Sequence, residues 1–565
     1  MKLNKISTVK IALLSCALSV FGGCNDFLER NHPTEVSDDQ FWATMNECSA
    51  ALEQCKLWVK GAWGGDELSL VFLEGATDNM YFYSNFDQRI VNLGNGSLVP
   101  PSDNNKPTGW EYYFDAWKNY YIRIRRCNRF LEHVDDAYFA DERERTRMKA
   151  EAKVWRAWYH IRLLNWYGRN DGIPIVEESL LPADIYKSRN TVDECLEFIN
   201  RELDEVLSIT DKDVFPFLWD EGRRERMSKA TALALKMDIN LQFHQYDIAK
   251  DAAKKLIDSG SFALYYSSSE SNDPGKSYRD LFCYTGEQNK ERIMFKSNGL
   301  DNIWFRNMST ILGGQGVSAP LKSLLDTYET IDGKTIQSLS ASEREQYEKD
   351  PLYKPRDPRL YATILLPNDN TSISNYTFEP FNPNSSDYVG KSGASRSGYL
   401  VKKYIDEQDR ASAGGSLDFM IYRYAEVLLD YVECLVETGD WQNPDVEKYI
   451  NMIRNRAGMP NMDKSVYNTQ EKVRELYRRE RRVELCFEGK RYDDIRRWKQ
   501  IDILRGDFYG MNKFGTEKSC DKNNENAYFK RRVEITRAFS EKNYWFPIHQ
   551  NQLDKNPNLR QLPKW

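Results

Sequence analysis

The sequence predicts a mainly α-helical protein in which pairs of helices form a scaffold and a loop-rich segment forms an irregular face. Three observations lead to this prediction. Apolar residues recur every three or four positions over long stretches, as on one side of a helix. The stretches 230–257 and 424–456 each predict two helices joined by a short turn. Between 262 and 418 the chain becomes rich in Asn, Ser, Pro and Gly, which are typical of loops.

The first 23 residues have the features of a lipoprotein signal peptide. A basic start is followed by the apolar run 11–21, which is too short to cross a bilayer and is typical of a secretory signal. Small residues then precede Cys24, as in a bacterial lipobox, so we expect acylation of Cys24 and a stable lipid anchor. Two alternatives remain: the rival Cys16, which lies inside the apolar run, and an ordinary cleaved signal that leaves Cys24 free.

Composition argues against several functional classes. Of the 565 residues, 41% are hydrophobic, which is enough for a folded core. The formal net charge is −6, and an acidic chain is a poor partner for nucleic acid. Neither a CxxC motif nor paired histidines at metal-binding spacing occur. The sequence therefore predicts no metal site and no cofactor, and we expect buried free thiols.

Helices are predicted in order along the N-terminal half. Ser37 is typical of a helix N-cap, and Phe41 and Trp42 begin an apolar face. Further periodic segments predict helices, with their tryptophans in the core, over 110–134, 146–168, 191–209 and 229–259. In the two predicted helix pairs, small Ala or Cys residues allow close packing, as in degenerate tetratricopeptide repeats.

The region 262–418 differs from the rest. Residues 292–295 predict a strand, whereas 366–398 is a loop by composition. That loop nevertheless carries Tyr376, Phe378 and Tyr388, which is many aromatic residues for a solvated segment. Long loops on a helical scaffold often carry function, so we expect the binding face here; a surface excursion without function is the alternative.

The stretch 478–499 carries nine cations and five acids. Glu480, Glu484 and Glu488 recur every four residues, so they would share one stripe of a helix among arginines that can pair with them. A nucleic-acid surface would leave its cations uncompensated, and a glycosidase needs two carboxylates across a cleft. We interpret the stretch as a structural ion network, with catalysis and nucleic-acid binding as the alternatives.

The same stretch resembles the C-terminal hallmark of the SusD/RagB family of surface glycan-binding lipoproteins. The match covers residues 480–498, and three more segments agree with the family in order and spacing: 422–429, 451–460 and 547–561. His549, Leu562 and Lys564 depart from the family's terminal pattern. The resemblance runs the length of the mature chain.

This resemblance implies a SusD-like α-α superhelix, whose tetratricopeptide-like helix pairs carry the irregular binding face. It implies a single domain over 24–565 after the signal peptide 1–23, with a helical part at about 36–260, a loop-rich insertion at about 262–418 and the hallmark region at about 419–565. It also implies a non-catalytic, lipid-anchored protein on the surface of the cell outer membrane. Such a protein binds an oligosaccharide or polysaccharide and delivers it to a SusC-like TonB-dependent transporter.

Candidate ligand-binding residues follow from the chemistry of sugar recognition. Sugar rings pack flat on aromatic side chains, and neighbouring polar groups bind the hydroxyls. Three segments outside the predicted helices combine both kinds of residue. The expected contacts are Asp78, Asn79, Tyr81 and Tyr83 in the first, Asn302, Trp304, Phe305 and Arg306 in the second, and Tyr376 in the third. Packing beneath a loop is the alternative for each.

Two other functions stay open. One is a transport subunit that binds a peptide or protein through its helix pairs. The other is a glycoside hydrolase, since the 85 acidic residues could include a catalytic pair.

Overall fold

The structure is a computed structural model that describes residues 41–56, 70–82, 88–100, 116–268, 272–300, 303–369, 373, 376–389, 391–412, 414–511 and 532–565. Its longer helices are α3 (Met45–Cys55), α4 (Gln88–Asn95), α5 (Ala116–His133), α6 (Glu142–Tyr167), α7 (Val192–Leu207), α8 (Lys229–Gln242), α9 (Tyr246–Asp258), α13 (Ala341–Lys349), α15 (Tyr424–Glu437), α16 (Pro444–Arg456) and α17 (Gln470–Glu484). Shorter helices are α10 (Lys276–Asp280), α11 (Ile303–Asn307), α12 (Lys322–Leu325), α14 (Pro358–Thr363), α18 (Arg491–Arg497) and α19 (Gln550–Lys555).

The strands of the described part form four small antiparallel pairs and no larger sheet. They pair as β1 (Met80–Phe82) with β3 (Ser318–Pro320), β2 (Arg292–Lys296) with β6 (Phe419–Arg423), β4 (Ile364–Leu365) with β5 (Leu400–Val401), and β7 (Arg505–Gly510) with β8 (Arg532–Ala538). The predicted strand at 292–295 corresponds to β2, and the predicted mainly α fold is confirmed.

The helices begin where the sequence supplies capping residues. The Asp141 side chain accepts a hydrogen bond from the Arg143 amide at the start of α6. Thr191 and Glu194 form a capping box at the start of α7. At α16, Asn443 caps the helix, and the following proline lies in its first turn, where a missing amide hydrogen costs nothing.

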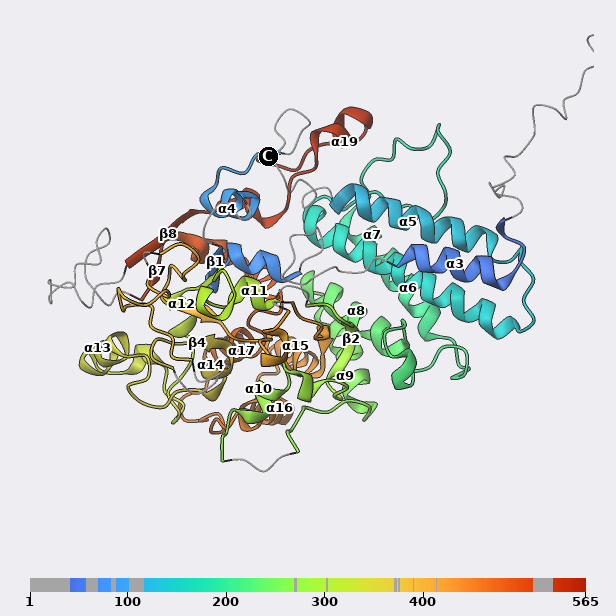
Figure 1. Cartoon of the computed structure of the whole chain (residues 1–565). Helices are drawn as coiled ribbons and strands as arrows, with labels where there is room; N and C mark the ends of the chain where they lie inside the picture. Colours follow the sequence, from blue (N-terminus) through green and yellow to red (C-terminus); the bar gives the residue numbers. More distant parts are fainter. Residues whose placement is uncertain are drawn as a thin grey trace, which may run out of the picture.

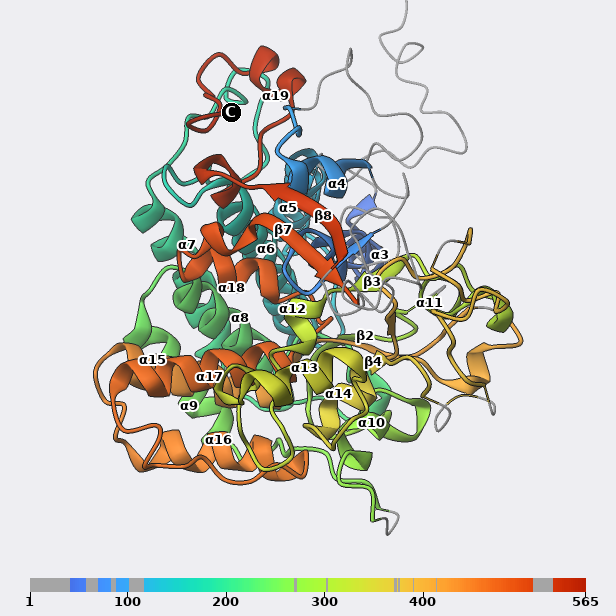
Figure 2. The same cartoon turned by 90° about the vertical axis from the view of Figure 1, so that its left-hand side faces the viewer.

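Successive helices pack against one another along the chain. The helices α5 to α9 pack in sequence order, α15 packs on α9, and α16 packs on α15. Both predicted helix pairs are confirmed, as α8 with α9 and α15 with α16. The N-terminal helices α3 and α5 to α7 lie together at one end of the molecule, away from α13, α14 and α16 (Figures 1 and 2). Within the described ranges, no helix is long and apolar enough to cross a membrane.

The arginine-rich stretch forms a buried ion network, as predicted, and some pairs lie within it, such as Arg481 with Asp494, but the cations that pair with its glutamates come from other elements. The carboxylates of Glu480, Glu484 and Glu488 are almost fully buried. The cations that reach them are Arg359 of α14, Arg423 at the end of β6, Arg454 and Arg456 of α16, and Lys403. Four segments are therefore joined to α17 and to the turn that follows it by charge-assisted hydrogen bonds, which are stronger than neutral ones. Glu488 lies in that turn, because α17 ends at Glu484, so the predicted helix stripe holds only Glu480 and Glu484.

One arginine lies at the centre of this network. Arg423 donates to Glu488 through Nε and Nη2, at 2.7 Å each, and through Nη1 to Glu484 at 2.8 Å. Its Nη1 also donates to Glu291, the residue before β2, at 3.0 Å. Because several cations surround Glu484, its pKa lies well below the usual value in spite of burial.

A second arm of the network reaches the N-terminal part of the chain. Arg491 donates to both oxygens of Asp78 at 2.9 Å, and Arg482 donates to the Asn79 side chain at 2.8 Å. Next to them, Glu74 is buried and accepts a hydrogen bond from Asn79 at 2.8 Å. Burial raises the pKa of Glu74 to about 7, although Asn79 and Arg491 act in the opposite direction.

Removal of one charge from the centre of the network should destabilise the fold strongly. We predict that Glu484→Gln costs about 3–5 kcal/mol, because guanidinium groups stay buried without their counter-charge. The matched control is Glu177→Gln, which breaks the exposed pair with Arg201 and should cost at most about 1 kcal/mol. Urea unfolding followed by circular dichroism measures both. Equal midpoints for the two variants would contradict the account.

The raised pKa of Glu74 predicts a specific pH dependence. A free Glu titrates near pH ~4.3, so the folded state binds this proton more tightly than the unfolded chain. The contribution of Glu74 to the free energy of unfolding is then largest at or below about pH 4, and it decreases as the pH rises towards the folded pKa of about 7. Glu74→Gln should therefore lose less stability than the wild type between pH 5 and pH 7. Urea midpoints at each pH test this, and parallel profiles would refute it.

Candidate ligand-binding pocket

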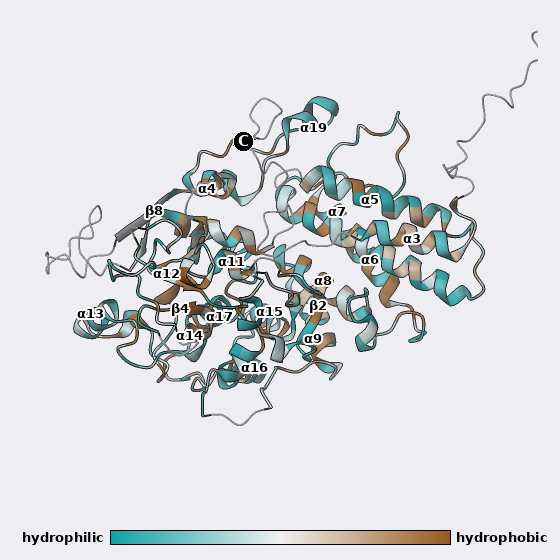
Figure 3. Cartoon of the chain, in the orientation of Figure 1, coloured by the Kyte–Doolittle hydropathy of each residue, from teal (hydrophilic) through white to brown (hydrophobic). Residues whose placement is uncertain are grey.

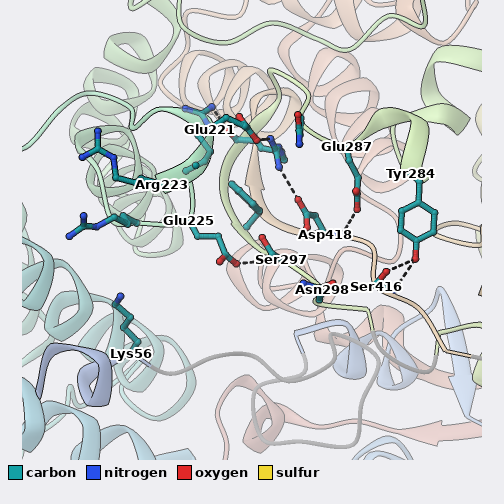
Figure 4. A pocket seen from close by; sticks show the side chains of 16 residues that line it. Lys56, Glu221, Arg223, Glu225, Tyr284, Glu287, Ser297, Asn298, Ser416 and Asp418 are labelled. Carbon is teal, nitrogen blue, oxygen red and sulfur yellow. Dashed lines mark hydrogen bonds and ion pairs between the residues drawn. The ribbon is translucent and has the colours of Figure 1, made fainter. Parts of the chain in front are cut away.

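A polar pocket of about 510 Å³ lies where three distant chain segments meet (Figure 4). Its walls come from the turn 221–226, the segment 284–298 around the start of β2, and residues 416–418 before β6. Lys56, just after α3, adds a cation from the N-terminal helices. A volume of this size is typical of small-molecule sites.

Arg292 organises the floor of the pocket. Its Nη1 donates to Asp418 at 2.8 Å, its Nη2 pairs with Glu221, and its guanidinium group lies 4.3 Å from the centre of the Phe295 ring. Arg224 donates to the backbone oxygen of Arg292 at 3.0 Å. Burial lowers the pKa of Arg224, and no ion-pair partner for it is found among the described residues. It is thus a half-buried cation that a ligand can reach.

The opposite wall is built around Tyr284. Its hydroxyl donates to Asp409 at 2.6 Å and accepts a hydrogen bond from the Ser416 amide at 2.9 Å. Glu287 accepts from the Asp418 amide at 3.1 Å. Burial raises the pKa of both Glu287 and Asp418, the latter in spite of its contact with Arg292.

These groups suit a ligand rich in hydroxyls. Carboxylates accept and guanidinium groups donate hydrogen bonds in one plane, which matches neighbouring hydroxyls of a sugar ring. Most of the charged groups already have an ion-pair partner within the pocket or next to it, so they are held in place before any ligand arrives. The Tyr284 ring, which is only partly buried, is the aromatic surface at this site.

Of the predicted aromatic residues, Trp304 lies under the loop region, and Tyr376 is half-buried beside it. Trp304 of α11 has 0% exposure, and its Nε1 donates to the backbone oxygen of Leu312 at 2.7 Å. Tyr376 packs against the same small apolar cluster and bonds to Asp387. Burial corrects the expectation that Trp304 offers a free ring face, because no side of the ring is open to a ligand.

The first predicted segment is also built into the structure. Tyr81 is buried in β1, opposite Ala319 of β3, so its ring is not a stacking surface either. Asp78 and Asn79 are buried in the ion network described above, where their hydrogen-bonding groups serve Arg491 and Arg482. The predicted residues Tyr83, Asn302 and Cys24 lie outside the described residues.

Phe305, another predicted aromatic residue, keeps solvent access, with 37% exposure. It lies on α11, next to the half-buried Arg306. The loop 414–418 connects α11 to the pocket. Its Gly414 backbone oxygen accepts a hydrogen bond from the Trp304 amide at 3.4 Å, and its Ser416 and Asp418 line the pocket. Phe305 and Arg306 therefore belong to an element that adjoins the pocket.

Sequence reasoning missed most of the pocket. Arg224, Tyr284, Glu287, Ser416 and Asp418 were not predicted, and none of the expected contact residues that the structure describes lines this pocket. Arg224 lies in the charged run 221–226, which by composition resembles an ordinary solvated turn.

Comparisons with known proteins agree with this architecture. A family model described as the SusD family matches residues 262–565, and one described as starch-binding and associating with the outer membrane matches 72–235. The curated SusD-like protein P38 of Formosa agariphila is 22% identical, over 90% of this chain and 94% of its own length.

Solved structures are similar over nearly the whole chain. A SusD-like carbohydrate binding protein from Bacteroides fragilis is 26% identical, with a TM-score of 0.75, and the match covers 92% of this chain and 100% of that one. Surface glycan-binding protein A from Bacteroides thetaiotaomicron, solved in complex with laminarihexaose, is 20% identical, with a TM-score of 0.62 over 92% of this chain and 99% of its own. Since the SusD family model covers more than half of the sequence, the chain belongs to the SusD family.

Proposed function

We propose that this protein binds an oligosaccharide or polysaccharide at the cell surface, without catalysis, and delivers it to a SusC-like TonB-dependent transporter of the outer membrane. Family membership supports the carbohydrate ligand, and a relative of 26% identity carries that property in its name. A lipid anchor at Cys24 would keep the protein beside such a transporter.

The pocket around Arg292 is the observation that carries the proposal. It combines pre-paired carboxylates and guanidinium groups with the Tyr284 ring and hydroxyl. Since each net hydrogen bond contributes only about 0.5–1.5 kcal/mol, several fixed groups around one sugar are needed for useful affinity. We propose that Phe305 and Arg306 extend this surface to the next sugar, while Trp304 and Tyr376 support it from below.

A hydrolase remains the second candidate because two carboxyl groups in the pocket have raised pKa values. Burial raises the pKa of Glu287 and of Asp418, which is the direction of shift that a general acid needs. Both are nevertheless engaged, since Asp418 pairs with Arg292 and Glu287 accepts a hydrogen bond from the Asp418 amide. This arrangement favours a binding role.

Substitutions in the pocket should weaken glycan binding. We predict that Arg224→Ala and Tyr284→Ala each reduce affinity about tenfold, equivalent to about 1.4 kcal/mol, and that Tyr284→Phe, which keeps the ring, loses less. Calorimetry with the soluble chain and a panel of polysaccharides measures this. Tyr138→Ala removes an exposed ring (73% exposure) elsewhere and should bind as the wild type does. Unchanged affinity in both pocket variants would refute the site, and silence across the whole panel would refute glycan binding.

Incubation with the bound glycan separates binding from hydrolysis. We expect no release of reducing ends above the buffer control over a day, because the carboxyl groups of the pocket are engaged in ion pairs and hydrogen bonds that stabilise its walls. Reducing ends that vanish in Glu287→Gln would establish the hydrolase instead. Co-purification with a transporter, together with no affinity for any glycan, would favour the peptide-binding alternative.

A further inference from the structure

A second groove, of about 350 Å³, lies among the N-terminal helices and shares no lining residue with the Arg292 pocket. It is bounded by α5, by the segment 174–187 and by α19 near the C-terminus (Figure 1). Its lining is mainly apolar and includes Trp117, Tyr121, Ile122, Ile185 and Leu559. The colouring of α5 by hydropathy shows hydrophobic residues among hydrophilic ones along this helix (Figure 3).

The walls of this groove are fixed by hydrogen bonds. Asn556 and Asn558, which follow α19, donate to the backbone oxygens of Lys187 and Tyr186 at 2.9 and 2.6 Å. The Tyr121 hydroxyl donates to the backbone oxygen of Pro174 at 2.8 Å. The groove is therefore a preformed surface, so an incoming partner need not organise it.

Large apolar side chains are exposed at this place. Ile122, Ile185 and Tyr186 have exposures of 40%, 47% and 45%, and all three line the groove. Leu181, in the same segment, is also exposed. Contiguous exposed apolar surface with a polar rim is typical of sites that bind another molecule.

The rim of the groove is positively charged, although the whole chain is acidic with a net charge of −6. Arg125, Lys187 and Lys555 line it, and none of them has an ion-pair partner among the described residues. Glu178 is the acidic residue of the lining. Unpaired cations around an apolar hollow favour a partner that brings acidic groups beside an apolar side chain.

We propose that this groove binds a peptide segment of a partner protein in which acidic residues flank one or two apolar side chains. The aliphatic lining suits a Leu or Trp side chain, and the Gln552 amide and the Glu178 carboxylate can pair with the peptide backbone. A lipid tail has no polar groups that could form hydrogen bonds with Gln552 and Glu178.

Three labelled peptides of equal length test the proposal by fluorescence anisotropy with the full mature chain. Each carries the same Leu and Trp residues, which are flanked by Glu, Gln or Lys. We expect the Glu peptide to bind at least about tenfold tighter than the Lys peptide, with an affinity that falls as salt is added. Equal affinity for the three peptides would overturn the proposal.

Protein variants place the binding on this groove. Arg125→Glu and Lys187→Glu should each weaken the Glu peptide at least about fivefold, and Ile185→Ser should weaken all three peptides. The matched control is Lys212→Glu, an exposed lysine outside the groove, which should bind as the wild type does. Arg125, Lys187 and Ile185 reach solvent, so the variants should fold, and circular dichroism checks this.

Two competition experiments test whether a membrane surface or a glycan, rather than a peptide, occupies the groove. In the first, the protein is mixed with vesicles that contain phosphatidylglycerol. If it binds them through Arg125 and Lys187 but does not bind the Glu peptide, the proposal is overturned in favour of a membrane surface. Displacement of the Glu peptide by a polysaccharide would also overturn it, because the groove would then belong to the glycan site. Peptide binding that both vesicles and polysaccharides leave unchanged supports it.

Discussion

The contact of Arg423 with Glu291, Glu484 and Glu488 is the constraint on which the rest of this structure depends. It joins the end of β6, the residue before β2 and the C-terminal part of α17 in a buried, fully charged cluster. Arg456 bridges Glu291 and Glu484 a second time, and Arg359 and Arg454 connect the cluster to α14 and α16. Since burial of an unpaired charge is far more costly than burial of a pair, these segments can come together only in this register.

The network also explains why the pocket lies where it does. Glu291, a member of the cluster, is followed directly by Arg292, which organises the pocket floor. The partner strand β6 ends at Arg423, which belongs to the cluster, and Asp418, which lines the pocket, comes just before β6 begins. The short strand pair of β2 and β6 therefore contacts the cluster at one end and supplies pocket residues along its length. The hallmark segment is therefore part of the scaffold, and β2 and β6 connect it to the pocket.

Local patterns were sufficient to predict the scaffold but not the site. Apolar periodicity and small residues located the helix pairs 230–257 and 424–456, because those contacts are close in sequence. The Glu480, Glu484 and Glu488 stripe predicted an ion network, yet its partners Arg359 and Arg423 are more than 60 residues away and carry no signal in their own surroundings. Trp304 shows the opposite error. Its polar, loop-like neighbourhood favoured an exposed ring, whereas distant residues such as Leu365 and Phe378 fold over it. Tyr284 and Ser416 meet only after folding, which is why neither was predicted.

Amide hydrogen exchange in the Glu484→Gln variant, under conditions in which it stays folded, tests the central claim most directly. If the buried cluster positions the pocket, loss of this one charge should accelerate exchange in β2 and β6 (292–296 and 419–423), as well as in α17, and leave the N-terminal helix α7 unchanged. Faster exchange confined to α17, with β2 and β6 protected as in the wild type, would contradict it.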